Sequence, residues 1–417
     1  MILIAADFCP PFSDALSSHH RIDIIAIDKH AEMDSTHLSK RQKIAHDDGP
    51  LTLRHDEYTV AWICALPIEL TAARAMLDEI HEPLPIHICD SNTYTLGRIR
   101  GHNIVIACLP IDRYGTVNAT NIVTNMRQTF TSIRVGLIVG IGGGVPSGPE
   151  TDIRLGDIVV GTRVMQVDLG KIIGDGQLEH TGVPRFPDQI LAKAVSHLRA
   201  KHVEKPSRIP SVLQQKLKGC GYGRPKSSDR LFHGMYKHMH PQGNCDQCDN
   251  SKIIKRRVRS SGDPVIHYGA IASGSQVVKS SAFRDKVARE LKVICFEMEA
   301  AGLMDILPCL PIRGICDYSD SHKSKEWQKY AAATAAAYAA ELLQELPVTE
   351  AHTRESCRRF PSKLNFTGLN PSSTDSCTRY RASSVAGATS TYARFPQIRA
   401  NSCSSKEYHE GRRSMGS

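Results

Sequence analysis

The stretch Tyr58-Thr-Val-Ala-Trp-Ile-Cys-Ala-Leu66, followed at once by Pro67-Ile-Glu-Leu-Thr-Ala-Ala-Arg-Ala-Met-Leu77, decides the fold class. The first run is rich in β-branched and aromatic residues and shows no polar alternation, which is typical of a strand covered on both faces. The second run has helical length and begins with proline, a residue suited to the first helical position. A buried strand that leads directly into a helix is the building unit of α/β folds.

Strand-like and helical segments continue to alternate along most of the chain. Continuous apolar runs predict further strands at 103–109, 135–141, 157–164, 265–272, 293–296 and 312–316. Helices are expected between them, at 117–130, 187–202, 281–291, 297–307 and 326–346. The last helix is rich in alanine, whose small side chain allows close packing on a sheet. This order predicts a mixed α/β sandwich with a largely parallel sheet.

Composition divides the chain into three parts. Residues 56–346 carry the alternating pattern and are expected to form the folded domain. Residues 1–55 keep no helical or strand period, and we interpret them as a poorly ordered leader. Residues 347–417 are rich in Ser and Arg, which predicts a disordered tail. Within the domain, residues 205–260 resemble a basic insertion between a helix and the next strand.

The positive charge of the chain is local. Its 417 residues include 52 Lys and Arg against 43 Asp and Glu, a net charge of +9. Residues 201–260 hold 14 basic and 4 acidic side chains, and residues 351–417 hold 11 and 4, so the remainder is acidic. The basic insertion lacks interleaved aromatic residues and any known nucleic-acid-binding pattern. We therefore expect a solvated surface loop there, and no nucleic acid partner.

The apolar runs and the cysteines bear on localisation. No apolar run is long enough to span a bilayer, and the apolar start at residues 1–6 is shorter than a signal peptide requires. The 13 cysteines are scattered without a framework spacing. We therefore expect an intracellular, cytoplasmic protein with reduced thiols and no membrane partner.

Cys245-Asp-Gln-Cys248 has the spacing of a pair of zinc ligands. A structural zinc site needs about four ligands, and the nearby candidates follow no regular spacing: Cys220, His233, His238 and His240. The sequence therefore favours a segment without metal and leaves zinc at this pair open.

Val139-Gly-Ile-Gly-Gly-Gly-Val-Pro146 ends a predicted strand with a glycine cluster. Because glycine has no Cβ, Gly140, Gly142 and Gly143 would let a ligand approach the backbone closely. A tight turn is the alternative explanation. The spacing differs from the dinucleotide-binding fingerprint, and no helix begins directly afterwards.

Four acidic residues stand at strand ends or helix starts. Glu297 and Glu299 occupy the point where an apolar strand runs into a helix, and a ligand's vicinal diol could satisfy one of these carboxylates. Asp317 follows another strand, at the edge where open α/β sheets bind ligands, and could donate a proton. Glu69 lies in the first turn of a helix and could accept a proton from water. Taken singly, each acid is also explained as an ordinary turn or helix-start residue.

Taken together, the motifs resemble the nucleoside phosphorylase and nucleosidase superfamily, which includes purine and uridine phosphorylases and cleaves the N-glycosidic bond of nucleosides. The resemblance covers roughly residues 58–346 and rests on the order of seven segments: Ala65-Leu-Pro-Ile-Glu-Leu70, Tyr114-Gly-Thr-Val-Asn-Ala119, Gly140-Ile-Gly-Gly-Gly144, Leu155-Gly-Asp-Ile-Val-Val160, Gly269-Ala-Ile-Ala-Ser-Gly274, Phe296-Glu-Met-Glu-Ala-Ala301 and Arg313-Gly-Ile-Cys-Asp317. The insertion that carries Cys245 and Cys248 is similar to the fungal branch, where such a domain often precedes NACHT or repeat domains of immune-receptor-like proteins.

The resemblance implies a three-layer α/β/α sandwich with a mixed, largely parallel sheet, and an enzyme that releases the base of a purine nucleoside or nucleotide. It implies no resident cofactor, and it implies a homo-oligomer. Glu299 would hold the ribose hydroxyls, Met298 would pack under the sugar, and Asp317 would protonate or hydrogen-bond N7 of the base. The glycine cluster and residues 273–278, among them Ser273 and Val277, would line the base slot.

The nucleophile decides between hydrolysis and phosphorolysis. In hydrolytic members a glutamate at the first strand–helix junction activates water, and this chain has Glu69 there, which would repel phosphate. Arg74 should face elsewhere. We therefore expect hydrolysis and keep two alternatives: phosphorolysis to ribose 1-phosphate with inorganic phosphate as co-substrate, and a catalytically silent module that senses nucleosides or nucleotides. Arg98, Arg113 and Lys323 leave room for a phosphorylated substrate.

Overall fold

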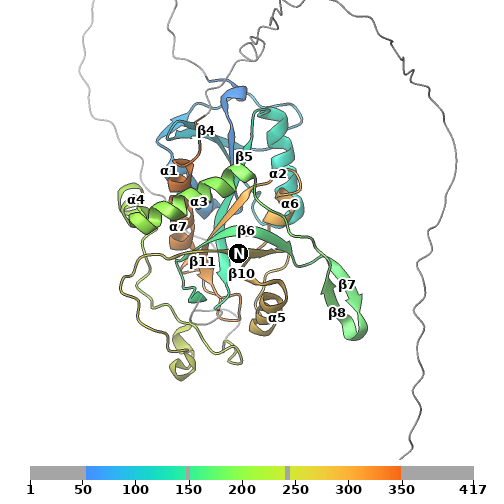
Figure 1. The fold of residues 1–417 in the computed structure, drawn as a ribbon, viewed down its shortest axis with the longest axis vertical. Coiled ribbons are helices and arrows are strands. Elements are labelled where there is room, and N and C mark those ends of the chain that lie inside the picture. The colour runs from blue at the N-terminus through green and yellow to red at the C-terminus, as the bar shows by residue number, and fades with distance from the viewer. Residues whose placement is uncertain (1–52, 147–150, 240–244, 349–417) are drawn as a thin grey trace, which may run out of the picture. The chain divides into compact units, whose positions relative to one another are not determined.

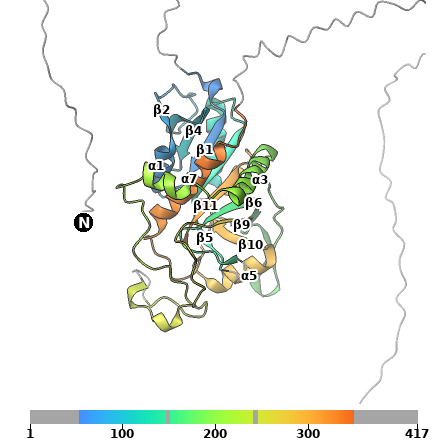
Figure 2. The same cartoon turned by 60° about the vertical axis from the view of Figure 1, so that its left-hand side comes forward.

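The computed structural model describes residues 53–146, 151–239 and 245–348 (Figure 1). The predicted leader and tail lie almost wholly outside these ranges. In the described part, one large mixed sheet carries helices on both faces (Figures 1 and 2). No helix within the described ranges combines the length and the apolar character that a membrane span requires.

The sheet has nine strands in the order β10-β9-β6-β11-β5-β1-β4-β3-β2. Strand β1 (Val60–Cys64) is central and runs parallel to β4 and β5, and the pairs β5–β11, β6–β9 and β9–β10 are also parallel. The pairs β2–β3, β3–β4 and β6–β11 are antiparallel, and β10 also pairs back to β5. The remaining strands are β2 (Glu79–His81), β3 (Tyr94–Ile99), β4 (His102–Cys108), β5 (Val135–Gly144), β6 (Ile158–Gln166), β9 (Ile266–Ser273), β10 (Val293–Glu297) and β11 (Leu310–Asp317).

Helices cover the sheet on both sides. Helices α1 (Pro67–Met76), α3 (Gln189–Glu204), α4 (Ile209–Lys216) and α7 (Gln328–Leu343) lie on one face, and α2 (Thr116–Thr129) and α6 (Ala300–Leu303) lie on the other. Helix α5 (Ser281–Leu291) packs beside β10. The two apolar layers meet at β1, because Val60, Trp62 and Cys64 join one cluster while Ala61 and Ile63 join the other. This confirms the predicted three-layer sandwich.

The alanine-rich helix α7 packs closely on the sheet, as its composition predicts. A Cβ added at Gly314 on β11 would collide with the carbonyl oxygen of Ala331 on α7. Small residues on both elements therefore set the distance between helix and strand. The close fit fixes β11, whose carboxyl end carries Asp317.

Some elements differ from the prediction. Strands β2 and β3, the helix α4 and a small two-stranded sheet of β7 (Gly170–Ile173) and β8 (Gln177–His180) were not expected. The helix predicted at 297–307 is regular only at α6, because Glu297 still belongs to β10 and Glu299 is the residue before the helix.

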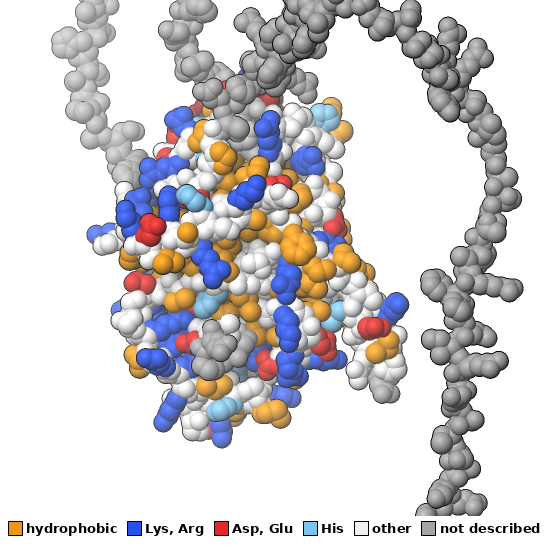
Figure 3. All heavy atoms as spheres, in the orientation of Figure 1, with side chains coloured by type: hydrophobic (Ala, Val, Ile, Leu, Met, Phe, Trp, Pro, Cys, Tyr) orange, Lys and Arg blue, Asp and Glu red, His pale blue; other side chains and the backbone are white. Residues whose placement is uncertain are grey.

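We predicted that the basic insertion is a solvated surface loop, and for part of it this prediction is wrong. Its helix α4 packs on α7, and Tyr222 is buried in the same apolar cluster. Two of its arginines are tied to acids, Arg256 to Asp229 at 2.5 Å and Arg259 to Asp157 at 2.7 Å. On the face drawn in Figure 3, basic side chains of the described residues are interspersed with apolar, uncharged and acidic ones.

Candidate active site

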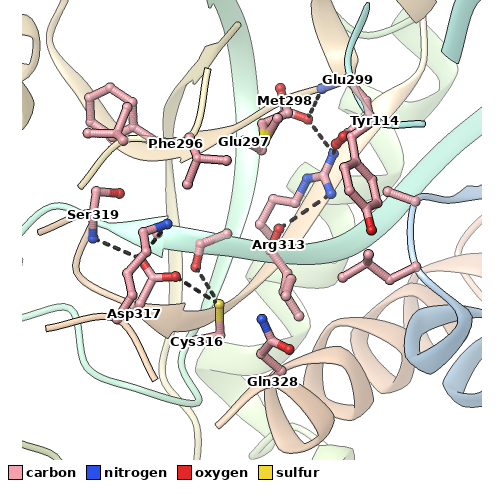
Figure 4. Close-up of a pocket in the computed structure, with 18 of the residues that line it drawn as sticks. Tyr114, Phe296, Glu297, Met298, Glu299, Arg313, Cys316, Asp317, Ser319 and Gln328 are labelled. Atoms are coloured by element: carbon pink, nitrogen blue, oxygen red, sulfur yellow. Dashed lines mark hydrogen bonds and ion pairs between the residues drawn. The ribbon is translucent and has the colours of Figure 1, made fainter. Parts of the chain in front are cut away.

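A cavity of about 480 Å³ lies at the carboxyl ends of β5, β10 and β11, beside the β1–α1 junction. Figure 4 shows ten of the lining residues, labelled from Tyr114 to Gln328, around this pocket. The lining includes Leu66, Glu69, Tyr114, Ile141, Gly142, Gly143, Val277, Phe296, Glu297, Met298, Glu299, Arg313, Cys316, Asp317, Ser319 and Lys323.

Glu69 is held in this lining by backbone donors. Because it is the third residue of α1, its side chain turns back to the start of the helix, where Oε2 accepts from the N–H of Ala65 at 2.7 Å and of Leu66 at 2.9 Å. Its Oε1 accepts from the N–H of Ile141 on β5 at 2.8 Å. Burial raises the pKa of Glu69, whereas Arg313 and the three N–H groups oppose the rise. A carboxyl group with a raised pKa is a better proton acceptor than an ordinary one.

Arg313 is a buried guanidinium surrounded by three acids. It is 1% exposed, its Nη2 donates to Glu297 Oε2, and the same nitrogen lies 3.4 Å from Glu299 Oε2. Glu69 also acts on it electrostatically and, with the other two acids, raises its pKa, although burial works the other way. One positive charge therefore faces three carboxyl groups, so the cluster would carry excess negative charge if all three were ionised.

Glu297 and Glu299 differ in how well the protein satisfies them. The carboxylate of Glu297 accepts from the N–H groups of Glu299 at 3.1 Å and Ala300 at 3.0 Å, as well as from Arg313. Among the residues that the structure describes, the Glu299 Oε1 has only a long contact, 3.5 Å, with the N–H of Gly115. Burial, followed by the charges of Glu297 and Glu69, raises the pKa of Glu299 to about 7, against the opposing effect of Arg313. Of this pair, Glu299 is the acid with acceptor capacity left for a ligand.

Asp317 lies on the other side of the cavity, beside Cys316 and Ser319 (Figure 4). Its Oδ1 accepts from the N–H of Ser319 at 2.8 Å and lies 3.3 Å from Nζ of Lys323, and its Oδ2 is 3.2 Å from Sγ of Cys316. A Cβ at Gly143 would lie 2.8 Å from Asp317 Oδ1 and would collide with Ser319 Oγ. The glycine is therefore required for this acid to sit at the strand end.

The other predicted site residues fall into two groups. Gly142, Gly143, Val277 and Met298 line the cavity. Gly140 and Ser273 lie behind the lining: a Cβ at Gly140 would collide with the Glu69 carboxylate, and the Ser273 Oγ accepts from the N–H of Ala301 at 2.9 Å. Gly140 and Ser273 therefore support the lining of the pocket and do not face the cavity.

The sequence argument did not include Arg313 among the site residues. It named Lys323 but missed three other residues of the cavity lining: Lys279, Lys325 and Gln328. A signal for Arg313 was present, since a charged residue stood inside an apolar strand in one of the quoted motifs.

A family model supports the resemblance inferred from the motifs. The model of the phosphorylase superfamily matches residues 59–346. This chain belongs to that superfamily. The assignment confirms the predicted family and accounts for the order of strands and helices in the described part of the chain.

Two relatives of this chain differ in kind: one is an NLR-like protein and the other is a nucleosidase. The chain is 44% identical over 301 residues to a nucleotide-binding leucine-rich repeat (NLR)-like protein of Hyaloscypha variabilis, a match that covers 70% of this chain and 30% of that protein. It is 26% identical over 303 residues to the 5′-methylthioadenosine/S-adenosylhomocysteine nucleosidase of Mycobacterium bovis, across 70% of this chain and 98% of the enzyme. The crystal structure of the Helicobacter pylori enzyme of that name is 17% identical, with a TM-score of 0.47 over 70% of this chain and 99% of its own.

Proposed function

We propose that this chain hydrolyses the N-glycosidic bond of a purine nucleoside. The observation that carries the proposal is the buried cluster of Glu69, Arg313 and Glu299, which shares one cavity with Asp317. The similarity to a nucleosidase over 98% of that enzyme's length supports the same reaction. The assignment of roles below is our own.

Glu299 holds the ribose. Two neighbouring hydroxyls of the sugar can donate to the two oxygens of one ionised carboxylate, and Glu299 makes only long contacts with Gly115 and Arg313. Its ionised form needs a counter-charge in this buried place, and Arg313 supplies one. Met298, next along the chain and in the cavity wall, packs against the sugar.

Asp317 engages the base. The bond between the sugar carbon and the purine nitrogen breaks more easily when a proton or a strong hydrogen bond reaches N7, because the leaving base then carries less negative charge. Asp317 lines the cavity, and its Oδ1 lies 3.3 Å from Nζ of Lys323. The lysine stabilises the negative charge that Asp317 would carry after giving up a proton.

Glu69 accepts the proton of the attacking water. As the glycosidic bond breaks, the sugar develops the positive charge of an oxocarbenium ion, and the carboxylates of the cluster stabilise it. Water then bonds to the sugar carbon, and its proton passes to Glu69, whose raised pKa suits this transfer. The products are a free purine and a free sugar.

A second candidate substrate follows from the lysines. Lys279, Lys323 and Lys325 all line the cavity, and lysine is a common point-charge ligand of phosphate. The lysines are compatible with two alternatives, a nucleotide as the substrate or phosphate as the attacking group, so both belong in the test.

The experiment is the release of free base by the purified full chain from adenosine, inosine, 5′-methylthioadenosine and adenosine monophosphate, each with and without inorganic phosphate. We expect release that needs no phosphate and yields an unphosphorylated C1 hydroxyl. Glu69→Gln and Asp317→Asn should lower the rate of release strongly, whereas Arg74→Gln, a change on the exposed side of the Glu69 helix near Thr95, should leave it nearly unchanged.

Two results would contradict hydrolysis. Strict dependence on phosphate, with a sugar 1-phosphate as product, would make the chain a phosphorylase and would leave Glu69 without its assigned role. Ligand binding without turnover in every condition would favour the sensing module, an alternative to which the similarity to an NLR-like protein gives weight.

A further inference from the structure

Away from the cavity's acids, the basic insertion closes into a loop that gathers two cysteines and a histidine. An antiparallel bridge between Phe232 and Ile253 joins the two ends of the loop. Between those ends, the ligand atoms of His238, Cys245 and Cys248 all lie within 4.8 Å of one another. The cysteine pair with zinc-ligand spacing thus meets, in space, a histidine that no regular spacing connects to it in the sequence.

The surroundings of the two thiols suit a neutral metal site. Cys245 is 7% exposed and Cys248 is 5% exposed, and both pack with the aromatic ring of Phe232. A divalent cation would bind both sulfurs as thiolates, and its two positive charges would cancel their two negative charges.

We propose that Cys245, Cys248 and His238 bind a zinc ion. Thiolate sulfur and imidazole nitrogen are the ligands that zinc prefers, and three protein ligands leave one tetrahedral position for a further group. His322 lies beside one of the three ligands: its ring centroid is 5.4 Å from that of His238, and its Nε2 has no hydrogen-bond partner among the described residues. The thiol protons are released to solvent when the metal binds.

The site would fasten the insertion to the segment that follows β11. The N–H of His238 donates to Ser321 Oγ at 3.0 Å, and Sγ of Cys245 lies 3.8 Å from the carbonyl oxygen of His322. The next residue, Lys323, pairs with Asp317 in the cavity. Zinc would therefore hold in place the segment that presents Lys323, which gives the metal a structural role beside the pocket.

The test is the metal content of the full chain, purified without chelators and measured by inductively coupled plasma mass spectrometry. We expect about one zinc per chain, lost in Cys245→Ser and Cys248→Ser and retained in Cys220→Ser, which alters an exposed cysteine of the same insertion. Cobalt added to metal-stripped wild type should give a thiolate-to-cobalt absorption band that Cys245→Ser lacks.

A second measurement keeps the proposal testable if the serine variants do not fold. The melting temperature of the metal-stripped wild type should rise on addition of zinc and not of magnesium. A reduced wild type that holds no zinc, takes up no cobalt and gains no stability from zinc would overturn the proposal. So would thiol titration showing that the purified chain has Cys245 and Cys248 joined in a disulfide that excludes the metal.

Discussion

Replacing Glu299 by glutamine tests the carboxylate that we assign to the ribose hydroxyls. An ionised carboxylate can accept from both hydroxyls, whereas the glutamine side chain keeps one acceptor oxygen and offers a donor in place of the other. Because Glu299 is 4% exposed and its own contacts are long, water cannot replace the lost acceptor without changing the pocket. The hydroxyl that faces the new NH₂ group is left without a partner.

The size of the effect follows from hydrogen bonds to a charged group. Each is worth about 1.5–3 kcal/mol, so the loss of one and the weakening of the other should cost about 2–4 kcal/mol of transition-state binding. This corresponds to a fall of roughly 30- to 1000-fold in kcat/KM. Steady-state kinetics on the best ribonucleoside and on its 2′-deoxy analogue, for wild type and Glu299→Gln, measure it.

The comparison of substrates provides the control. If Glu299 binds the diol, wild type should discriminate against the 2′-deoxy analogue and the variant should discriminate much less, since the partner of the missing hydroxyl is already gone. Equal discrimination by the two proteins would refute the assignment, even if the variant were slow. A general loss of activity from poor folding would leave the ratio unchanged.

The same substitution should raise stability at high pH. The pKa of Glu299 is about 7 in the folded chain and 4.5 ordinarily, so the native state binds this proton more tightly than the unfolded chain does. Ionisation therefore costs stability progressively as the pH rises from about 4.5 to 7, to an upper limit of about 3 kcal/mol. Glu299→Gln removes that cost, and its melting temperature should exceed that of wild type at pH 8 and not at pH 4; the reverse order would contradict the burial argument.

Three further predictions concern the rest of the site. Glu69→Gln should lower kcat about 100- to 10,000-fold with little change in KM; a large rise in KM at constant kcat would assign Glu69 to binding instead. Gly140→Ala should strongly reduce activity and stability because its methyl group would collide with the Glu69 carboxylate. The control is Gly174→Ala, where a Cβ meets open space, and it should leave turnover unchanged. Equal effects of the two substitutions in kinetics and thermal melts would argue against the steric explanation. Lys323→Met should lower kcat/KM, and the same change in an Asp317→Asn background should have little effect; additive losses would separate the two residues.

The sequence predicted most of the sandwich because its central strands are continuous apolar runs. β1 is buried along its whole length, so each residue of the strand carries the signal. Strand β3 was missed because it mixes exposed, partly exposed and buried residues and includes Gly97, where an added Cβ would collide with the carbonyl oxygen of Glu79 on β2. A strand of this kind is recognised by its neighbours in space, here β2 and β4, rather than by its own composition.

The site was predictable where its residues stand in ordered motifs. The structure brings the four predicted acids around one cavity, although their individual roles remain proposals. The sequence signalled Arg313 as a charge inside an apolar strand but not its partners, because the acids that surround it come from β1–α1 and β10–α6. The sequence could not single out His238 among the nearby histidines, because the structure, through the Phe232–Ile253 bridge, brings it close to Cys245 and Cys248. The predicted homo-oligomer stays a prediction.

The most direct test of the central claim is to follow oxygen from water into the sugar. The full chain would be incubated with its best purine substrate in water enriched in heavy oxygen, with inorganic phosphate present, and the sugar product analysed by mass spectrometry. Hydrolysis with Glu69 as the base predicts one heavy oxygen at C1 of a sugar without a 1-phosphate, and loss of this product in Glu69→Gln. A sugar 1-phosphate without the label would contradict the account.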